Sequence, residues 1–245
     1  MISILLVLAA FVAGAMNAVA GGGSFLTFPS LVFAGVPPVM ANATNTVALF
    51  PGALAASWAY RDAFPRLEDL KVWTLLAVSL VGAVIGATLL IVTPEETFRA
   101  AIPWLLLAAT LLFATGPRLT PILRRRFRLS APGLYTMQFI VAIYGGYFGG
   151  AIGILMLAAF TLYGLSDIHE MNALKTLLGG LLNGVAVVCF IIAGKIDWPP
   201  ALLMLTASVA GGYFGARVAR RMNPTHIRAL IIAIGAVMTV VFFTR

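Results

Sequence analysis

Apolar runs long enough to cross a membrane constrain this chain more than any other feature of its sequence. The charged residues fall mostly into a few short stretches, and the runs between them are apolar. A helix needs about 20 apolar residues to cross the ~30 Å hydrocarbon layer of a bilayer. Only helices and closed barrels satisfy the backbone in lipid, and these runs lack the alternating pattern of barrel strands. The sequence therefore predicts an all-α, polytopic integral membrane protein.

The composition supports a lipid environment and argues against nucleic-acid binding. Of the 245 residues, 61% are hydrophobic and 10% are charged, whereas a soluble domain carries about 25% charged residues. The mean hydropathy is +1.03. The net charge of +8 comes from basic residues at the ends of apolar spans, where they face anionic headgroups and fix orientation. The expected partners are therefore the lipid bilayer and a small ligand, and not nucleic acid.

Two related halves repeat at an offset of about 130 residues. Asn42, Ala43 and Thr46 match Asn172, Ala173 and Thr176. The order of glycine-rich break, N-A-x-x-T motif, G-x-x-x-G pair and proline is shared. We assign residues 1–116 to the first repeat, 117–131 to a basic linker and 132–245 to the second repeat. The apolar segments are expected at 2–20, 24–35, 41–59, 70–92 and 99–115, and at 133–148, 152–164, 171–193, 199–219 and 227–243.

Arginines set the expected orientation, because cytoplasmic loops carry an excess of basic residues. Five lie in the linker and four near the turn at residue 220: Arg118, Arg124, Arg125, Arg126 and Arg128, then Arg217, Arg220, Arg221 and Arg228. If both regions are cytoplasmic, each half has three spans and one glycine-broken hairpin, and the second half is inverted. Inverted repeats are typical of transporters. In the competing topology each broken segment crosses once, which places the arginine turn outside.

Glycines interrupt the start of each half. The first break contains Gly21, Gly22, Gly23 and Ser24, followed by Pro29. Its counterpart in the second half contains Gly145, Gly146, Gly149, Gly150 and Gly153. Glycine frees the backbone, so amide N–H groups at a helix start can turn toward an anion. Broken helices at membrane depth are tolerated where they line a cavity. The alternative is close helix packing, which we prefer for the G-x-x-x-G pairs at 82–86 and 211–215.

Polar side chains open the next segment of each half, at A-N-A-T-N-T (41–46) and M-N-A-L-K-T (171–176). The candidate ligand-binding residues are Asn42, Thr44, Asn45 and Thr46, and Asn172, Lys175 and Thr176. Lys175 is the strongest candidate, because an ammonium within a bilayer is costly and marks a pathway, a partner or a ligand. The alternatives are that it reaches the interface or pairs with Asp167 or Glu170.

Other polar residues suggest no further chemistry. Asn17 and Asn183 either hydrogen-bond between helices or line the path of the ligand, and we prefer the first role. His169, His226 and the single cysteine, Cys189, lack companions at ligand spacing, so neither a metal site nor a cofactor is expected. Every Asp and Glu lies near a predicted helix end, which favours uniport, an electrogenic facilitator or coupling through another residue type over a relay of buried carboxylates.

At these motifs the sequence resembles the TauE/SafE family of sulfite and organosulfonate exporters, also called the 4-toluene sulfonate uptake permease family. The resemblance rests on Gly21 to Pro29, on the G-V-P-P turn at Gly35 to Pro38 that leads into A-N-A-T-N-T, and on Y-G-G-Y-F-G-G-A-I-G at 144–153. It implies transport of a sulfur-containing anion such as sulfite, a sulfonate or sulfoacetate.

The expected function is transport of a small anion across a bacterial-type inner membrane by a multi-pass protein. The alternatives are an anion channel and an intramembrane enzyme. The enzyme is disfavoured, since G-x-S-x-G and H-E-x-x-H are absent and no catalytic residue is assigned. A homodimeric assembly is compatible with the sequence.

Overall fold

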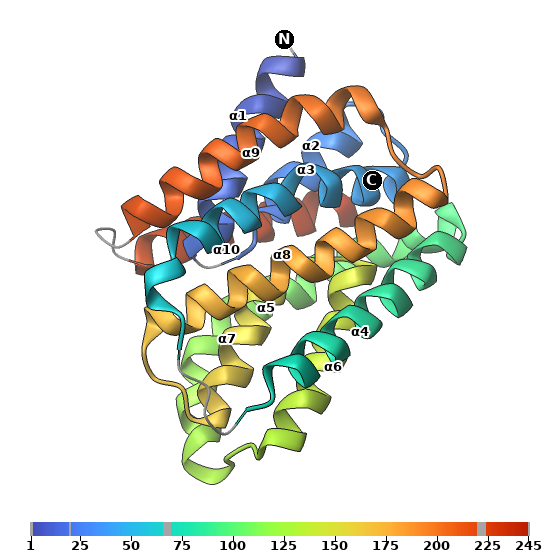
Figure 1. Cartoon of the computed structure of the whole chain (residues 1–245). Coiled ribbons are helices and arrows are strands. Elements are labelled where there is room, and N and C mark those ends of the chain that lie inside the picture. Colours follow the sequence, from blue (N-terminus) through green and yellow to red (C-terminus); the bar gives the residue numbers. More distant parts are fainter. Residues whose placement is uncertain (1, 20, 66–69, 220–223, 245) are drawn as a thin grey trace.

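The computed structural model describes residues 2–19, 21–65, 70–219 and 224–244. These residues form helices and loops without any β-strand. The helices, shown in Figure 1, are α1 (Ile2–Val19), α2 (Ser24–Phe33), α3 (Pro38–Ala59), α4 (Val72–Val92), α5 (Glu95–Arg126), α6 (Ala131–Tyr147), α7 (Ile152–Tyr163), α8 (Ile168–Ile192), α9 (Trp198–Ala219) and α10 (Pro224–Phe243), with a short 3-10 turn at Arg61–Ala63.

Each apolar segment expected from the sequence corresponds to one of these helices. The main difference is α5, which we expected to end near residue 115 and which continues to Arg126. Hydropathy marks only the part of a helix that suits lipid, whereas leucine and arginine sustain a helix beyond it. Most of the arginines of the expected linker therefore lie on the last turns of α5. Arg220 and Arg221 lie outside the described residues.

Four of the described helices are long and apolar enough to cross a membrane: α4, α5, α8 and the Trp198–Val218 part of α9. The shorter apolar helices are Ile2–Ala18, Ser24–Phe33, Ile152–Tyr163 and Arg228–Phe243. Large apolar side chains such as Trp73, Ile192 and Val240 are exposed on the surface. A surface with this many exposed large apolar groups suits lipid rather than water. The fold is that of an all-helical, polytopic membrane protein.

Helices from the two halves pack across each other in a reciprocal way. In Figure 1, α9 from the second half lies along α1, and α4 from the first half lies along α6. Likewise α9 contacts α3, α4 contacts α8, α5 contacts α7, and α10 contacts α2. If α1 to α5 are matched in order with α6 to α10, each of these contacts corresponds to another one, as α1 with α9 corresponds to α6 with α4. This reciprocity supports a duplicated fold, while its orientation in the membrane stays a prediction.

Glycines allow the closest of these contacts. A Cβ added at Gly86 on α4 would meet the Ile143 carbonyl oxygen of α6, and one at Gly211 on α9 would meet the Phe11 carbonyl oxygen of α1. Small residues let helix backbones approach this closely. The G-x-x-x-G pairs thus serve packing, as expected, and they fix α1 and α6 against helices of the other half.

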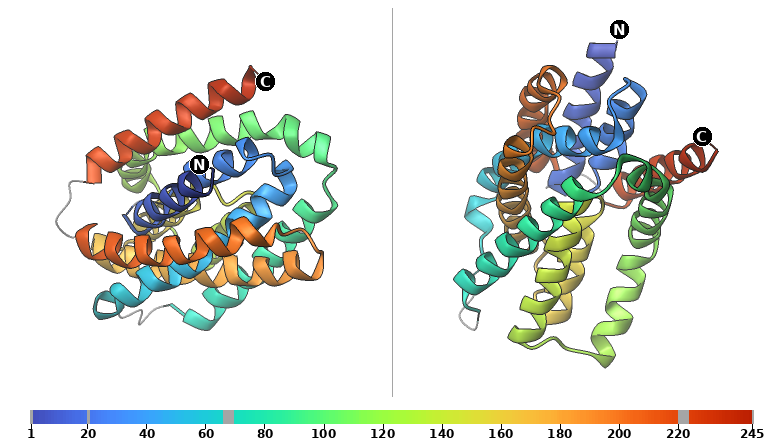
Figure 2. Two further views of the ribbon diagram at one scale, coloured as in Figure 1. Left: turned by 90° about the horizontal axis from the view of Figure 1, so that it is seen from above. Right: turned by 90° about the vertical axis from the view of Figure 1, so that its right-hand side faces the viewer.

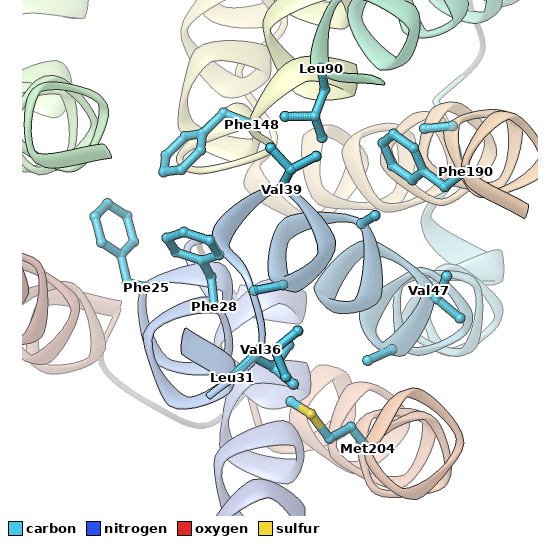
Figure 3. Close-up of a cluster of buried hydrophobic side chains, with 14 of the residues drawn as sticks. Phe25, Phe28, Leu31, Val36, Val39, Val47, Leu90, Phe148, Phe190 and Met204 are labelled. Carbon is cyan, nitrogen blue, oxygen red and sulfur yellow. The ribbon is translucent and has the colours of Figure 1, made fainter. Parts of the chain in front are cut away.

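The short helix α2 lies inside the molecule and organises the largest apolar cluster. Figure 3 shows Phe25, Phe28 and Leu31 of α2 among side chains from other helices, and all three are buried. The Phe28 ring packs against those of Phe98 and Phe148. The left view of Figure 2 shows α2 between helices of the second half (orange and red) and α5 (green). The start of α2 is therefore held firmly at the centre of the protein.

Candidate functional site

The two glycine breaks adopt backbone conformations that ordinary side chains disfavour. Gly21 and Gly22 have φ angles of 81° and 97°. In the second break Gly149 has a φ of 78°, and Ala151 has a φ of 62°. The left-handed region costs a residue with a Cβ roughly 1–2 kcal/mol. The glycines therefore permit sharp connections from α1 to α2 and from α6 to α7.

These two breaks meet each other. A Cβ added at Gly21 would lie 3.1 Å from the Cα atom of Gly153, so the backbone of the first break touches the start of α7. A half-enclosed cavity of about 50 Å³ lies at this meeting point. It is lined by residues of both breaks and of α3 and α8: Asn17, Gly21, Gly22, Ser24, Asn45, Thr46, Leu49, Ala53, Gly149, Ile152, Gly153, Met156, Lys175, Thr176, Gly179 and Asn183.

Most of the residues expected from the sequence lie at this cavity. Those that line it are Gly21, Gly22, Ser24, Asn45, Thr46, Gly149, Gly153, Lys175 and Thr176. Those that do not line it are Gly23, Asn42, Thr44, Gly150 and Asn172. The structure thus brings the two breaks and the two polar motifs together, but part of each motif has another position.

Two stripes at helical spacing form facing walls. Asn45, Leu49 and Ala53 lie along α3, and the repeat-equivalent positions Lys175, Gly179 and Asn183 lie along α8. Residues four apart share one face of a helix. Of the later members, only Asn183 was expected from the sequence as a residue that could line the path. Continuing the spacing from Asn45 and Lys175 identifies Leu49, Ala53 and Gly179 as well.

Asn183 lines the cavity, and none of the recorded hydrogen bonds of the described residues involves its side chain. Our interpretation of it as a residue that hydrogen-bonds between helices is therefore not supported. Asn17 has both roles: it lines the cavity, and its Oδ1 accepts a hydrogen bond of 2.7 Å from the Gly23 N–H.

Lys175 is the charged group of this site. Its side chain is 3% exposed, and its Nζ donates to Asn172 Oδ1 at 2.7 Å and to the Ala18 carbonyl oxygen at 3.4 Å. Among the described residues no carboxylate pairs with it, and neither Asp167 nor Glu170 does so. Both acceptors are neutral, so they leave the buried ammonium without a counter-charge.

The last carbonyls of the broken helices are satisfied from the opposite half. Lys175 of the second half reaches Ala18 near the end of α1. Asn42 of the first half donates through Nδ2 to the Tyr147 carbonyl oxygen, at 2.9 Å, at the end of α6. Carbonyls at a helix end lack intrahelical donors. Asn42 therefore supports the break structurally, which explains why it does not line the cavity.

The start of α7 at the cavity retains donors that have no acceptor among the described residues. Among the described residues, the backbone N–H groups of Ile152 and Gly153 donate to no acceptor. Asn45 Nδ2 donates to Ser24 Oγ at 3.2 Å, and Thr27 donates to Asn45 Oδ1. Amide N–H groups at a helix start are favourable partners for an anion.

Carboxylates hold the starts of α3 and α8. Glu95 Oε1 accepts from the Val39 N–H at 3.0 Å. Asp167 Oδ1 accepts from the N–H groups of Glu170 and His169, and these bonds hold the pKa of this carboxyl below its usual value. Thr44 Oγ1 accepts from the Asp197 N–H at 3.0 Å, so it too has a structural partner.

The fold and the site together define the class of protein. It is a multi-pass helical membrane protein in which the two glycine breaks, between α1 and α2 and between α6 and α7, meet at a cavity lined by the buried Lys175. The sequence model of the sulfite exporter TauE/SafE family matches residues 6–242. The chain belongs to this family of membrane transporters.

Individual relatives agree with this assignment. A probable membrane transporter protein of Haemophilus influenzae is 32% identical over 94% of this chain and 89% of its own length. The probable membrane transporter protein YfcA of Escherichia coli is 31% identical over 94% of this chain and 85% of its own length. The probable membrane transporter protein YunE of Bacillus subtilis is 25% identical over 95% of both chains. No solved structure matches the chain significantly.

Proposed function

We propose that this protein carries a small sulfur-containing anion, such as sulfite, a sulfonate or sulfoacetate, across the membrane through the cavity between its two breaks. One observation carries the proposal: the ammonium of Lys175 is buried in this cavity without a carboxylate partner among the described residues. A bound anion supplies the missing counter-charge. The family, whose name refers to sulfite export, supports a sulfur oxyanion.

The chemistry of the cavity suits an oxyanion. The N–H groups of Ile152 and Gly153, which have no acceptor among the described residues, offer hydrogen bonds, and the side chains of Asn45 and Thr46 lie on the same lining. Hydrogen bonds to a charged acceptor are the stronger ones. Binding therefore combines one full positive charge with several neutral donors.

Transport requires that the cavity open to each side in turn. We propose that the group formed by α1, α2, α3 and α9 moves against the group formed by α4, α6, α7 and α8, with the inverted topology and the basic end of α5 in the cytoplasm of a bacterial-type cell. The reciprocal packing of the halves supports this division, because each group contains one long helix of the other half.

Flux measurements in proteoliposomes test the proposal. We expect saturable uptake of labelled sulfite or methanesulfonate by the wild-type protein and loss of most of it in Lys175→Ala. Lys71→Ala is the matched control, because Lys71 is exposed at the start of α4. Unchanged flux in Lys175→Ala would remove this residue from the site, and flux that does not saturate would favour a channel.

A ligand-induced shift of the melting temperature gives a second readout. A ligand that binds the folded state stabilises it by about 2.7 kcal/mol at 100 times its dissociation constant. We expect sulfite or a sulfonate to raise the melting temperature of the wild-type protein in detergent but not that of Lys175→Ala. No shift with any sulfur oxyanion would contradict the proposed substrate class.

A further inference from the structure

The cavity holds a single formal charge. Residues 1–60 and 129–166, which provide α1, α2, α3, α6 and α7, contain no Asp, Glu, Lys or Arg. Along the sequence, Glu170 on α8 is the nearest charged residue before Lys175, and Lys195, beyond the end of α8, is the nearest one after it. Of the described residues that line the cavity, Lys175 alone carries a charge.

The helix ends add partial charges in opposing pairs. At the first break the end of α1 lies beside the start of α2, and at the second break the end of α6 lies beside the start of α7. A helix carries roughly half a positive charge at its N-terminus and half a negative charge at its C-terminus. The two kinds of end offset each other to first order. The free N–H groups still donate hydrogen bonds, but the net charge offered to a ligand stays close to that of Lys175.

The two walls of the cavity differ in polarity. The α8 wall presents Lys175, Gly179 and Asn183, whereas the α3 wall continues from Asn45 into Leu49 and Ala53. Ile152 and Met156 of α7 add further apolar lining. An apolar group of a ligand can therefore be buried in the same cavity that binds its charged end.

From this charge count we infer that the cavity, if it binds anions as proposed above, selects singly charged sulfonates with a small apolar substituent over doubly charged anions. A monoanion neutralises Lys175. A dianion leaves one negative charge in a buried site that has no second cation among the described residues, and burying an unpaired charge is unfavourable. Simple sulfonates are then better ligands than sulfoacetate.

A matched pair of competitors tests this inference. Sulfoacetate and its primary amide have the same number of non-hydrogen atoms, and they differ by one negative charge at neutral pH. Uptake of labelled methanesulfonate into proteoliposomes is measured against increasing amounts of each. We expect sulfoacetate to inhibit about tenfold or more weakly than its amide, a factor that corresponds to ~1.4 kcal/mol.

Adding a second cation should reverse this preference. Asn45 is the repeat equivalent of Lys175 and lines the same cavity, so Asn45→Lys should improve sulfoacetate relative to the amide by about tenfold. Asn183→Lys places the charge two turns along α8 and should have the same effect. Thr115→Lys adds the same charge at an exposed position of α5 and should leave the ratio unchanged.

The outcomes separate this inference from the proposed function. If the wild-type protein transports no methanesulfonate and no competitor binds, the proposed function fails. If it transports methanesulfonate and sulfoacetate competes as well as its amide, the charge selection is wrong while the transport proposal stands. The inference is also overturned if both lysine variants retain the wild-type melting temperature and the wild-type ratio. The wild-type ratio decides the question even where neither variant folds.

Discussion

Replacing Asn42 should lower the stability of the protein without changing its affinity for the ligand. The side chain donates from Nδ2 to the Tyr147 carbonyl oxygen, which joins α3 of the first half to the end of α6, and it lies outside the cavity. Asn183 provides the opposite case, because it lines the cavity and has no recorded hydrogen bond with another described residue. Both are asparagines, so Asn→Ala removes the same amide at either position.

The expected size of the effect follows from the hydrogen bond that is lost. Asn42 is 1% exposed, so Asn42→Ala leaves the carbonyl of Tyr147 without its donor in a buried position. An unsatisfied buried carbonyl costs about 1–3 kcal/mol, whereas hydrogen bonds inside a membrane protein contribute about 0.6 kcal/mol on average and up to about 1.7 kcal/mol. We expect a loss of about 1–2 kcal/mol for Asn42→Ala and about 0.5 kcal/mol or less for Asn183→Ala.

Two measurements on the same three proteins check this. The free energy of unfolding is obtained by denaturant titration in detergent for the wild type, Asn42→Ala and Asn183→Ala. The KM for methanesulfonate is obtained from the folded fraction in proteoliposomes. Asn42→Ala should lose stability and keep the wild-type KM, whereas Asn183→Ala should keep its stability and change its KM.

Either of two results would refute the reasoning. Equal losses of stability in both variants would show that the hydrogen bond between Asn42 and Tyr147 contributes no more to the free energy of unfolding than the side-chain amide of Asn183 does. A larger change of KM in Asn42→Ala than in Asn183→Ala would place Asn42 in ligand binding rather than in support of α6.

Three further changes have expected outcomes. Gly21→Val should sharply reduce folded yield and flux, because its φ is 81° and a Cβ there would meet Gly153. Gly211→Val should lower the melting temperature because it forces α9 from α1, while Gly116→Val, with nothing within 4 Å of its added Cβ, should fold and show little of this effect. The lowered pKa of Asp167 means that its contribution to stability is present above the usual value of 3.8 and is lost as pH falls below it. The difference in melting temperature between wild type and Asp167→Asn should therefore shrink as pH is lowered through this range.

Hydropathy and glycine content predicted the helices and the two breaks, because both depend on properties of short segments. Short segments do not show which residues of a polar motif line the cavity and which ones hydrogen-bond to other helices. Asn42 and Thr46 are one helical turn apart on the same face of α3. Even so, Asn42 lies beside the end of α6, whereas Thr46 lines the cavity. Similarly, the G-x-x-x-G spacing at Gly82 and Gly86 indicates close packing but does not identify α6 as the partner.

Asn45 and Lys175, at equivalent positions, are held in different ways. Asn45 is engaged by Thr27 and Ser24, which belong to the first half as it does. Lys175 instead reaches Ala18 of the other half, at a distance of 3.4 Å. An anion bound to the Lys175 ammonium competes with the Ala18 carbonyl oxygen for this group, so its binding weakens the hydrogen bond between α8 and α1. The hydrogen bonds of Asn45 on α3 are not affected in this way. The movement that follows binding should therefore begin at the contact of α8 with α1.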